Sequence, residues 1–249
     1  MRRRAALSER DTLYRDLIAQ CDGEPVQTAI AGQIWSLVQT EHATGLAMSL
    51  LPSDKPGHSS HFHLTGKPLI ELAELSLSWN PREAALGMAA VCAACNITSR
   101  FEGAEEANGK DLLLTKATGK KVGLVGHFPW TDEIRAVAGS LTVFEQRPQD
   151  GDLPEAAEEY LLPRQDIIAI TGSALSNKSL PRLLELAGGA WVMLIGPSTP
   201  LSVLMFDYGV DALSGCVAHD PEELADIVRE GGGVREFRNA VRFVTIRKP

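Results

Sequence analysis

The sequence contains few cysteines and no excess of positive charge. Four cysteines in 249 residues are too few for a disulfide-stapled scaffold, so we expect a cytoplasmic protein. The 24 basic residues against 32 acidic ones give a formal net charge of −8, which argues against nucleic acid and against an anionic membrane surface as partners. No apolar run approaches the ~20 residues that cross a bilayer. After the basic residues 2–4, the polar residues 8–11 interrupt the sequence before an apolar segment can form, so no secretory signal is expected.

The signatures of three enzyme classes are also missing. The chain has no G-x-S-x-G, no H-E-x-x-H and no G-x-x-x-x-G-K-[ST]. Serine hydrolase, zincin and P-loop NTPase functions therefore lack their sequence support. The composition itself, with 44% hydrophobic and 22% charged residues, is that of a globular chain long enough to bury a core.

Residues 1–100 have the pattern of a small α+β domain. Apolar spacing predicts a helix over 7–20, and the composition predicts one strand over 26–40 with its hairpin partner over 44–51. Two helices are expected next, over 69–77 and from Asn80 to about residue 96. Asn80 is the expected N-cap of the second helix, with proline directly after it. We expect 101–120 to be a linker region.

Residues 121–249 alternate between short apolar strands and helical segments. The expected strands are 121–126, 140–145, 166–171, 191–196 and 212–217, with a last edge strand over 241–246. Continuous apolar strands separated by helices indicate a parallel sheet covered on both faces. The predicted fold class is therefore α/β, a Rossmann-like doubly wound and mostly parallel sheet preceded by the smaller α+β domain.

Ligands of such sheets bind at the carboxyl ends of the strands, and two loops there carry titratable residues. His127 follows the first strand, in a loop without the G-x-G-x-x-G fingerprint of dinucleotide binding. Glu145 ends the second strand and Asp152 follows it. An imidazole and two carboxylates can ligate a divalent transition metal, His127 can act as an acid–base catalyst, and Glu145 can bind a ribose diol. The alternative requires no ligand: His127 is then a polar residue that lines the loop, and Glu145 is a solvated residue at the end of a strand.

Small hydroxyl residues follow the third and fourth strands. Thr171 and Ser173 stand in a glycine-containing turn before Asn177, and Ser198 and Thr199 stand between two prolines. Backbone N–H groups in such turns approach an anion closely. The alternative is that these residues cap turns and helices.

Two further groups resemble metal sites less specifically. Cys92 and Cys95 form a C-x-x-C pair inside an alanine-rich helix, where core packing is the alternative to a redox or metal role. His58, His61 and His63 share a polar loop that could bind a transition metal or simply be solvated.

Taken in order, four loops resemble the putative heavy-metal chelation family. They read Gly-His-Phe-Pro at 126–129, Gly-Asp-Leu-Pro at 151–154 after Glu145, Ile-Thr-Gly-Ser-Ala-Leu at 170–175 and Gly-Pro-Ser-Thr-Pro-Leu-Ser at 196–202. In the N-terminal half, Ser-Trp-Asn at 78–80 and the helix 87–96, which ends in Asn96, are similar to the family's smaller domain. The resemblance implies an enolase-N-terminal-like domain (1–100), a linker (101–120) and a Rossmann-like chelation domain (121–249).

The resemblance further implies a site in the cleft between the domains and a role in chelating heavy metals. Its positions fall on nine residues of this sequence: Asn96, His127, Glu145, Asp152, Thr171, Ser173, Asn177, Ser198 and Thr199. We assign His127, Glu145 and Asp152 to a metal, His127 also to catalysis, and the other six to ligand binding. The cysteine pair and the three loop histidines are outside the family pattern.

Three functions stay open on the sequence alone. The first is a protein that binds a transition metal or metal chelate, the second an enzyme with a nucleotide-like or adenosyl ligand in the same cleft, and the third a non-catalytic interaction module. Four small-residue loops at one sheet edge disfavour the third. The expected partner is a small molecule or metal ion, with a second copy of the chain as a further candidate. The sequence names neither the metal nor the oligomeric state.

Overall fold

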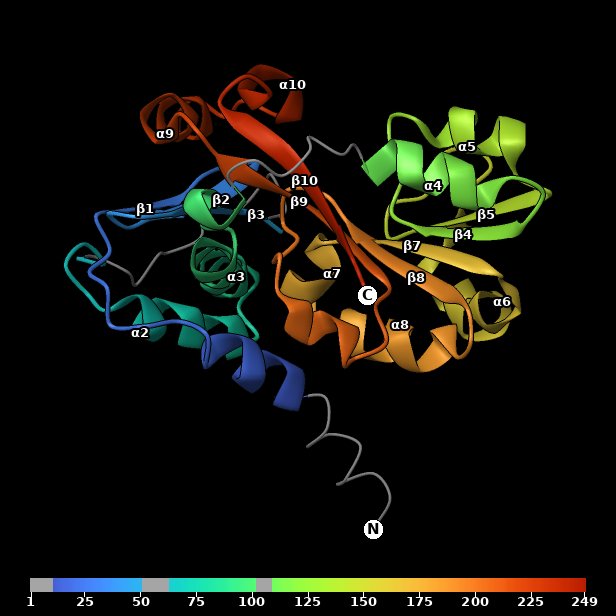
Figure 1. Cartoon of the computed structure of the whole chain (residues 1–249), viewed down its shortest axis with the longest axis horizontal. Coiled ribbons are helices and arrows are strands. Elements are labelled where there is room, and N and C mark those ends of the chain that lie inside the picture. Colours follow the sequence, from blue (N-terminus) through green and yellow to red (C-terminus); the bar gives the residue numbers. More distant parts are fainter. Residues whose placement is uncertain (1–10, 51–62, 102–108) are drawn as a thin grey trace, which may run out of the picture.

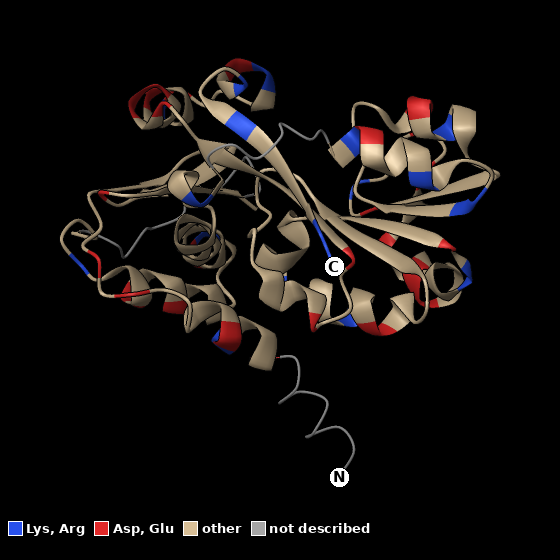
Figure 2. Ribbon diagram, viewed as in Figure 1, with Lys and Arg blue, Asp and Glu red and all other residues tan. Residues whose placement is uncertain are grey.

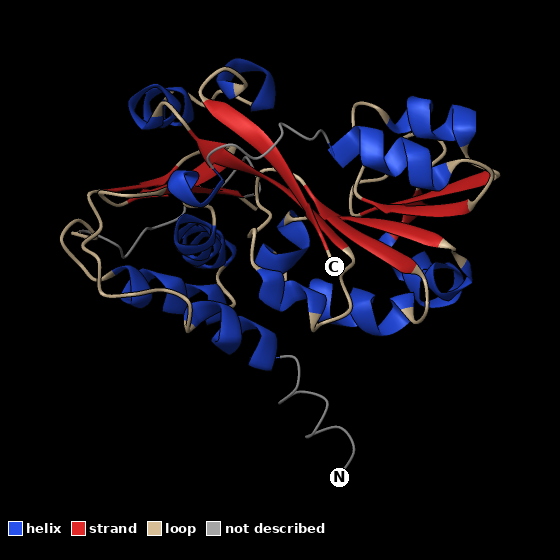
Figure 3. Cartoon of the chain, in the orientation of Figure 1, coloured by secondary structure: helices blue, strands red, loops and turns tan. Residues whose placement is uncertain are grey.

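The computed structural model describes residues 11–50, 63–101 and 109–249, and these form two β-sheets with helices around them (Figures 1 and 3). The smaller sheet is antiparallel and has the order β1-β2-β3, with strands Thr28–Ala31, Trp35–Gln39 and Thr44–Met48. The larger has the order β10-β9-β8-β7-β4-β5-β6. Its strands are β4 (Lys121–Val125), β5 (Ser140–Glu145), β6 (Leu153–Pro154), β7 (Ile167–Thr171), β8 (Trp191–Ile195), β9 (Ala212–Ala218) and β10 (Val241–Arg247). The predicted α/β class is confirmed.

Strand order in the larger sheet is that of a Rossmann fold. Strands β4 to β9 are parallel, and β10 is added antiparallel to the outer edge of β9. Starting from β6, the sheet contains its third, second, first, fourth, fifth and sixth strands in that order, which is the dinucleotide-binding arrangement. The order reverses between β4 and β7, so the loops after these two strands lie where ligands of this fold class bind.

Both faces of the larger sheet are covered because successive strand residues point to opposite sides. Ile168 and Ile170 belong to one buried cluster, whereas Ile167 and Ala169 belong to another. The second cluster includes residues of α4 (Gly109–Ala117) and α5 (Thr131–Val137). Short helices cover the opposite face: η3 (Glu155–Ala157), α6 (Glu158–Leu161), η4 (Leu162–Arg164), α7 (Ser173–Ser176), α8 (Leu180–Ala187) and η5 (Val203–Phe206).

In the N-terminal half, α3 lies between the smaller sheet and a helical layer. This layer comprises the helix of residues 11–18, α2 (Leu69–Ala73) and η1 (Glu74–Leu77), while α3 spans Pro81–Cys95 and η2 spans Thr98–Phe101. A Cβ atom added to Gly45 of β3 would lie 2.1 Å from the Ala89 carbonyl oxygen. Strand and helix backbones can approach this closely only because glycine and alanine are small. Asn80 caps α3 as predicted, accepting a hydrogen bond from Arg82 N–H.

The two halves of the chain share their hydrophobic core. Trp35 of β2 packs edge-on against Phe237 of α10 (Val234–Phe237), with ring centroids 5.5 Å apart. The same cluster contains Leu224 of α9 (Pro221–Arg229). The division at residues 100 and 120 remains a prediction, and within the expected linker α4 packs on the larger sheet through Leu113.

Several local predictions differ from the structure. The stretch 26–40 forms two strands because Gly32 interrupts it, its N–H donating to the Trp35 carbonyl. Thr131 is the first residue of α5, and its hydroxyl group bonds the backbone of Phe128. His58 and His61 lie outside the described residues, and His63 is exposed. No helix of the described segments is long and apolar enough to cross a membrane.

Candidate functional site

His127 lies at the point where the strand order of the larger sheet reverses. It follows β4 through Gly126, whose φ of +103° favours glycine. A Cβ on Gly126 would lie 3.2 Å from the Thr171 side chain of the neighbouring strand β7. The turn therefore brings the loops after β4 and β7 together at the carboxyl edge of the sheet.

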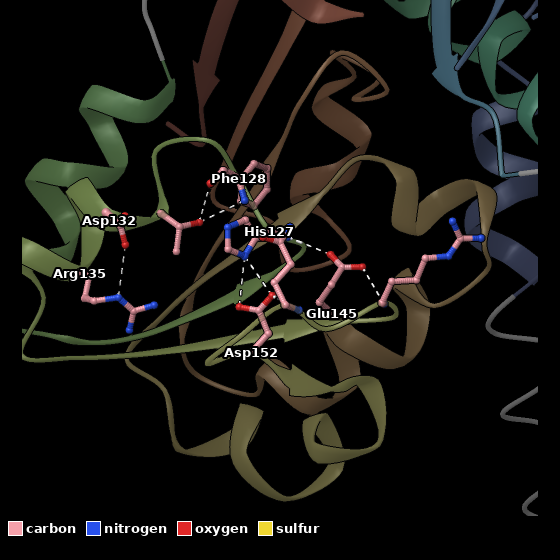
Figure 4. A network of polar contacts seen from close by, with 9 residues as sticks. His127, Phe128, Asp132, Arg135, Glu145 and Asp152 are labelled. Carbon is pink, nitrogen blue, oxygen red and sulfur yellow. Dashed lines mark hydrogen bonds and ion pairs between the residues drawn. The ribbon is translucent and has the colours of Figure 1, made fainter. Parts of the chain in front are cut away.

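Asp152 orients the imidazole ring of His127. Its carboxylate oxygens lie 3.0 and 3.2 Å from His127 Nδ1 (Figure 4). The Asp152 side chain is 1% exposed and that of His127 is 28% exposed. Asp152 also accepts a hydrogen bond of 3.1 Å from Gln149 N–H. With Nδ1 directed at the carboxylate, Nε2 is the ring nitrogen left for a metal ion or a proton.

Glu145 holds the backbone of the same loop. One carboxylate oxygen accepts the His127 N–H at 3.0 Å and the other accepts the Arg147 N–H at 3.2 Å. The structure thus brings together the three residues that the sequence assigned to a metal, and each carboxylate has a partner within the group. In a nicotinamide enzyme an acidic residue at this strand end accepts hydrogen bonds from a ribose, whereas here both oxygens already accept from backbone.

An aromatic pair supports the loop on its other side. The rings of Phe128 and Trp130 are stacked with centroids 4.5 Å apart and an interplanar angle of 13°. Thr131 fixes the turn that contains them, because its hydroxyl bonds both the N–H and the carbonyl of Phe128. Sequence reasoning missed this pair, although two aromatic residues flanking Pro129 were a visible signal.

Hydroxyl groups of the next two loops point at one another or at the backbone. The hydroxyl oxygens of Thr171 and Ser173 lie 3.0 Å apart. Ser198 accepts the Met48 N–H at 2.8 Å, which connects its loop to β3. The hydroxyl of Thr199 is buried and has no hydrogen-bond partner in the part of the chain that the structure describes. A Cβ on Gly172 would meet that hydroxyl at 2.8 Å, so the loops after β7 and β8 are in contact.

The two asparagines assigned to ligand binding are both held by protein groups. Asn96, at the end of α3, is 1% exposed. Its amide nitrogen donates to the carbonyls of Thr199 and Cys216, both at 3.0 Å, and its oxygen accepts the Leu201 N–H at 2.7 Å. Asn177 accepts hydrogen bonds from the backbone and hydroxyl of Ser179. Asn96 thus joins the N-terminal half to the larger sheet, and Asn177 shapes the turn before α8.

The comparisons with known proteins agree in one description. Two family models, both described as "Putative heavy-metal chelation", match residues 14–95 and 108–247. The chain belongs to this family. An uncharacterized protein of Methanocaldococcus jannaschii is 30% identical over 215 residues, covering 82% of this chain and 81% of the relative.

Two crystal structures of family members with unknown function have the same fold. The protein from Desulfitobacterium hafniense is 31% identical, with a TM-score of 0.87 over 97% of this chain and 99% of that one. The protein from Pyrococcus horikoshii is 20% identical, with a TM-score of 0.80 over 94% and 98% of the two chains.

The family description implies a metal, and the donor set near His127 limits how one could bind. Among the described residues no three or more His, Cys, Asp and Glu side chains are grouped to hold a metal ion. The carboxylates of Glu145 and Asp152 are already hydrogen-bonded within the loop. The described residues therefore do not supply a complete set of protein ligands for a metal ion.

The four cysteines are a second potential donor set, and all are buried and free. Burial strongly raises the pKa of the Cys92 thiol, with further increases from nearby Cys95, Cys216 and Cys21. Thiolates rather than thiols bind metals. Burial and a raised thiol pKa therefore favour core packing over metal binding for the cysteine pair in α3.

Proposed function

We propose that this protein binds a transition metal in the form of a chelate, at the edge formed by the loops after β4, β5, β7 and β8. One observation carries the proposal. The buried carboxylate of Asp152 lies 3.0 Å from Nδ1 of the His127 ring, which is partly exposed. A carboxylate in this position fixes the tautomer and raises the basicity of a metal-binding imidazole.

A chelate explains why a family named for heavy metals has so few protein donors here. His127 Nε2 supplies one position, and the other ligands come from the bound molecule. The glycine and hydroxyl residues of the neighbouring loops would contact the organic part, since small residues let backbone N–H groups approach a ligand. Asp152 and Glu145 act as orienting residues in this proposal, not as metal ligands.

Native mass spectrometry with elemental analysis tests whether the purified protein carries a metal. The protein is prepared without a histidine tag and without added metal. We expect a transition metal together with an organic mass in stoichiometric amount. An organic mass without metal would overturn the proposal in favour of the enzyme with a nucleotide-like ligand.

Titration calorimetry then compares free Ni²⁺ with its nitrilotriacetate and histidine complexes. We expect one of the complexes to bind at least about tenfold more tightly than the free ion, and His127→Ala to abolish this preference. His42→Ala is the matched control, because His42 Nδ1 also lies on a carboxylate, 2.8 Å from Glu24, but the ring is 70% exposed. Equal losses of affinity for the nickel complex in the two variants would contradict the proposal.

A further inference from the structure

A cavity of about 390 Å³ lies at the opposite edge of the larger sheet from His127. Trp191 begins β8 and Arg247 ends the antiparallel β10, so both mark the amino ends of the parallel strands. The cavity is lined by Lys116, Trp191, Asp211, Arg247, Lys248 and Pro249. Its size is at the lower end of the range for small-molecule sites. It shares no residue with the proposed chelate site.

Among the described residues, two of the three cationic side chains of the cavity have neutral groups as partners. Lys116 Nζ lies 5.5 Å from the centroid of the Trp191 ring. Lys248 Nζ donates to the carbonyl oxygen of Phe206 at 3.2 Å. Within the described segments, none of the ion pairs involves Lys116, Arg247 or Lys248. None of the three therefore forms an ion pair with a carboxylate side chain of these segments.

Asp211 contributes a carboxylate side chain to the lining, and its bonds are to the backbone. Its Oδ2 accepts the Val192 N–H at 2.8 Å, and its carbonyl accepts the Lys248 N–H at 2.9 Å. It therefore joins the start of β8 to the segment after β10 and shapes the cavity wall. The lining side chains therefore carry three positive charges and one negative charge.

This concentration of positive charge is unusual in a chain with a net charge of −8. Some other cations of the larger half are paired, as Arg182 is with Glu159 and Glu185 and Lys110 is with Glu133. Figure 2 shows basic colour at the end of β10, near the C-terminus. A concave site with uncompensated charge of one sign concentrates ligands of the opposite sign.

We propose that this cavity binds a small oxyanion that carries two or more negative charges. Phosphate and carboxylate oxygens form strong charge-assisted hydrogen bonds with guanidinium and ammonium groups. One such anion would compensate the cavity's excess positive charge. Phosphate esters and polycarboxylates share this chemistry, and the experiment separates them.

Titration calorimetry with pyrophosphate, citrate and acetate at low and moderate salt tests the proposal. We expect pyrophosphate or citrate to bind at least about tenfold more tightly than acetate, with binding weakened by salt. The ratio of pyrophosphate to citrate affinity identifies the favoured oxyanion. Absence of saturable binding by both multivalent anions would overturn the proposal.

Charge variants locate the anion. The triple variant Lys116→Gln, Arg247→Gln, Lys248→Gln should weaken binding by at least about tenfold, and Arg247→Gln alone should weaken it measurably. The control triple Lys67→Gln, Arg135→Gln, Arg238→Gln removes the same charge outside the cavity. Equal effects of the two triples would overturn the proposal. So would loss of anion binding in His127→Ala, whereas failure of chelate binding alone leaves this inference intact.

Discussion

Asp152 holds His127 from inside the protein, with a carboxylate oxygen 3.0 Å from Nδ1 and only 1% of its side chain exposed. The pair of Glu24 and His42 has a similar contact at 2.8 Å, but with side-chain exposures of 21% and 70%. Exposed pairs contribute little because solvent screens them and the side chains remain mobile. The two histidines therefore share one local geometry and differ in how firmly the ring is held.

We expect Asp152→Asn to weaken binding of the metal chelate about 10- to 100-fold, because the His127 ring loses the carboxylate that fixes its tautomer. Titration calorimetry measures the affinity, and the unfolding midpoint in urea checks the fold. Glu24→Gln makes the matching change at His42 and should leave chelate affinity unchanged. Unchanged affinity in Asp152→Asn would remove the orienting role.

The stability of the protein should depend on the ionisation of Glu158 in α6. Burial raises the pKa of this carboxyl to about 7, with contributions from Glu155 and Glu159. Because the folded-state pKa is raised, the stabilising contribution is full below the unfolded value of 4.5 and is lost as pH rises through about 7. Glu158→Gln should therefore stabilise the protein by about 1–3 kcal/mol at pH 8 and by much less at pH 5. Urea unfolding at both pH values measures this difference, with exposed Glu230→Gln as control.

Asn96→Ala should destabilise the protein by about 2–4 kcal/mol, because it removes three buried hydrogen bonds and leaves the carbonyls of Thr199 and Cys216 without their donor. The free energy of unfolding in urea gives the magnitude. Asn177→Ala removes hydrogen bonds of a half-buried turn and should cost only about 1 kcal/mol. Similar costs for the two variants would argue against Asn96 as the connection between the halves.

Gly45→Ala should destabilise the fold by about 3 kcal/mol, since the added methyl would lie 2.1 Å from Ala89 O and Ala93 N of α3. For a chain of this size the melting temperature would fall by roughly 6–12 °C. Gly23→Ala is the control, because no atom lies within 4 Å of its added methyl. A melting temperature equal to that of the control would mean that β3 and α3 are further apart.

The native protein should react slowly with a thiol reagent such as dithionitrobenzoate. Its four cysteines are buried, and burial raises the pKa of each thiol, so little thiolate is accessible. In guanidinium chloride all four should react. Rapid reaction of any cysteine in the folded state would reopen the question of a thiolate metal site.

Much of the fold could be predicted because burial on both faces gives parallel strands a continuous apolar sequence. Segments such as β7 (Ile167–Thr171) and β8 (Trp191–Ile195) are therefore visible in the sequence. The cap Asn80 was also recognisable, since it is followed by proline and accepts a helix N–H. The break at Gly32 was not recognised, because apolar residues continue on both sides of it.

The sequence predicted which loops form the site, but not which hydrogen bonds their side chains make. The rule that ligands lie at the carboxyl ends of strands selected His127, Glu145 and Asp152, which the structure joins by hydrogen bonds. It could not indicate that the carboxylates bond backbone and ring groups of their own loops. It also could not assign the amide of Asn96, because its three partners lie more than 100 residues away in sequence.

The contact between Trp35 and Phe237 has a consequence for synthesis on the ribosome. The N-terminal strands emerge about 200 residues before the helix that completes their core, since Trp35, which is 2% exposed in the folded chain, packs against Phe237. At a translation rate of about 5–20 residues per second, this apolar surface of the nascent chain stays uncovered for roughly 10–40 s. A gene fragment that encodes the first hundred residues alone should therefore yield an insoluble product, and chaperones that bind nascent chains should favour this segment.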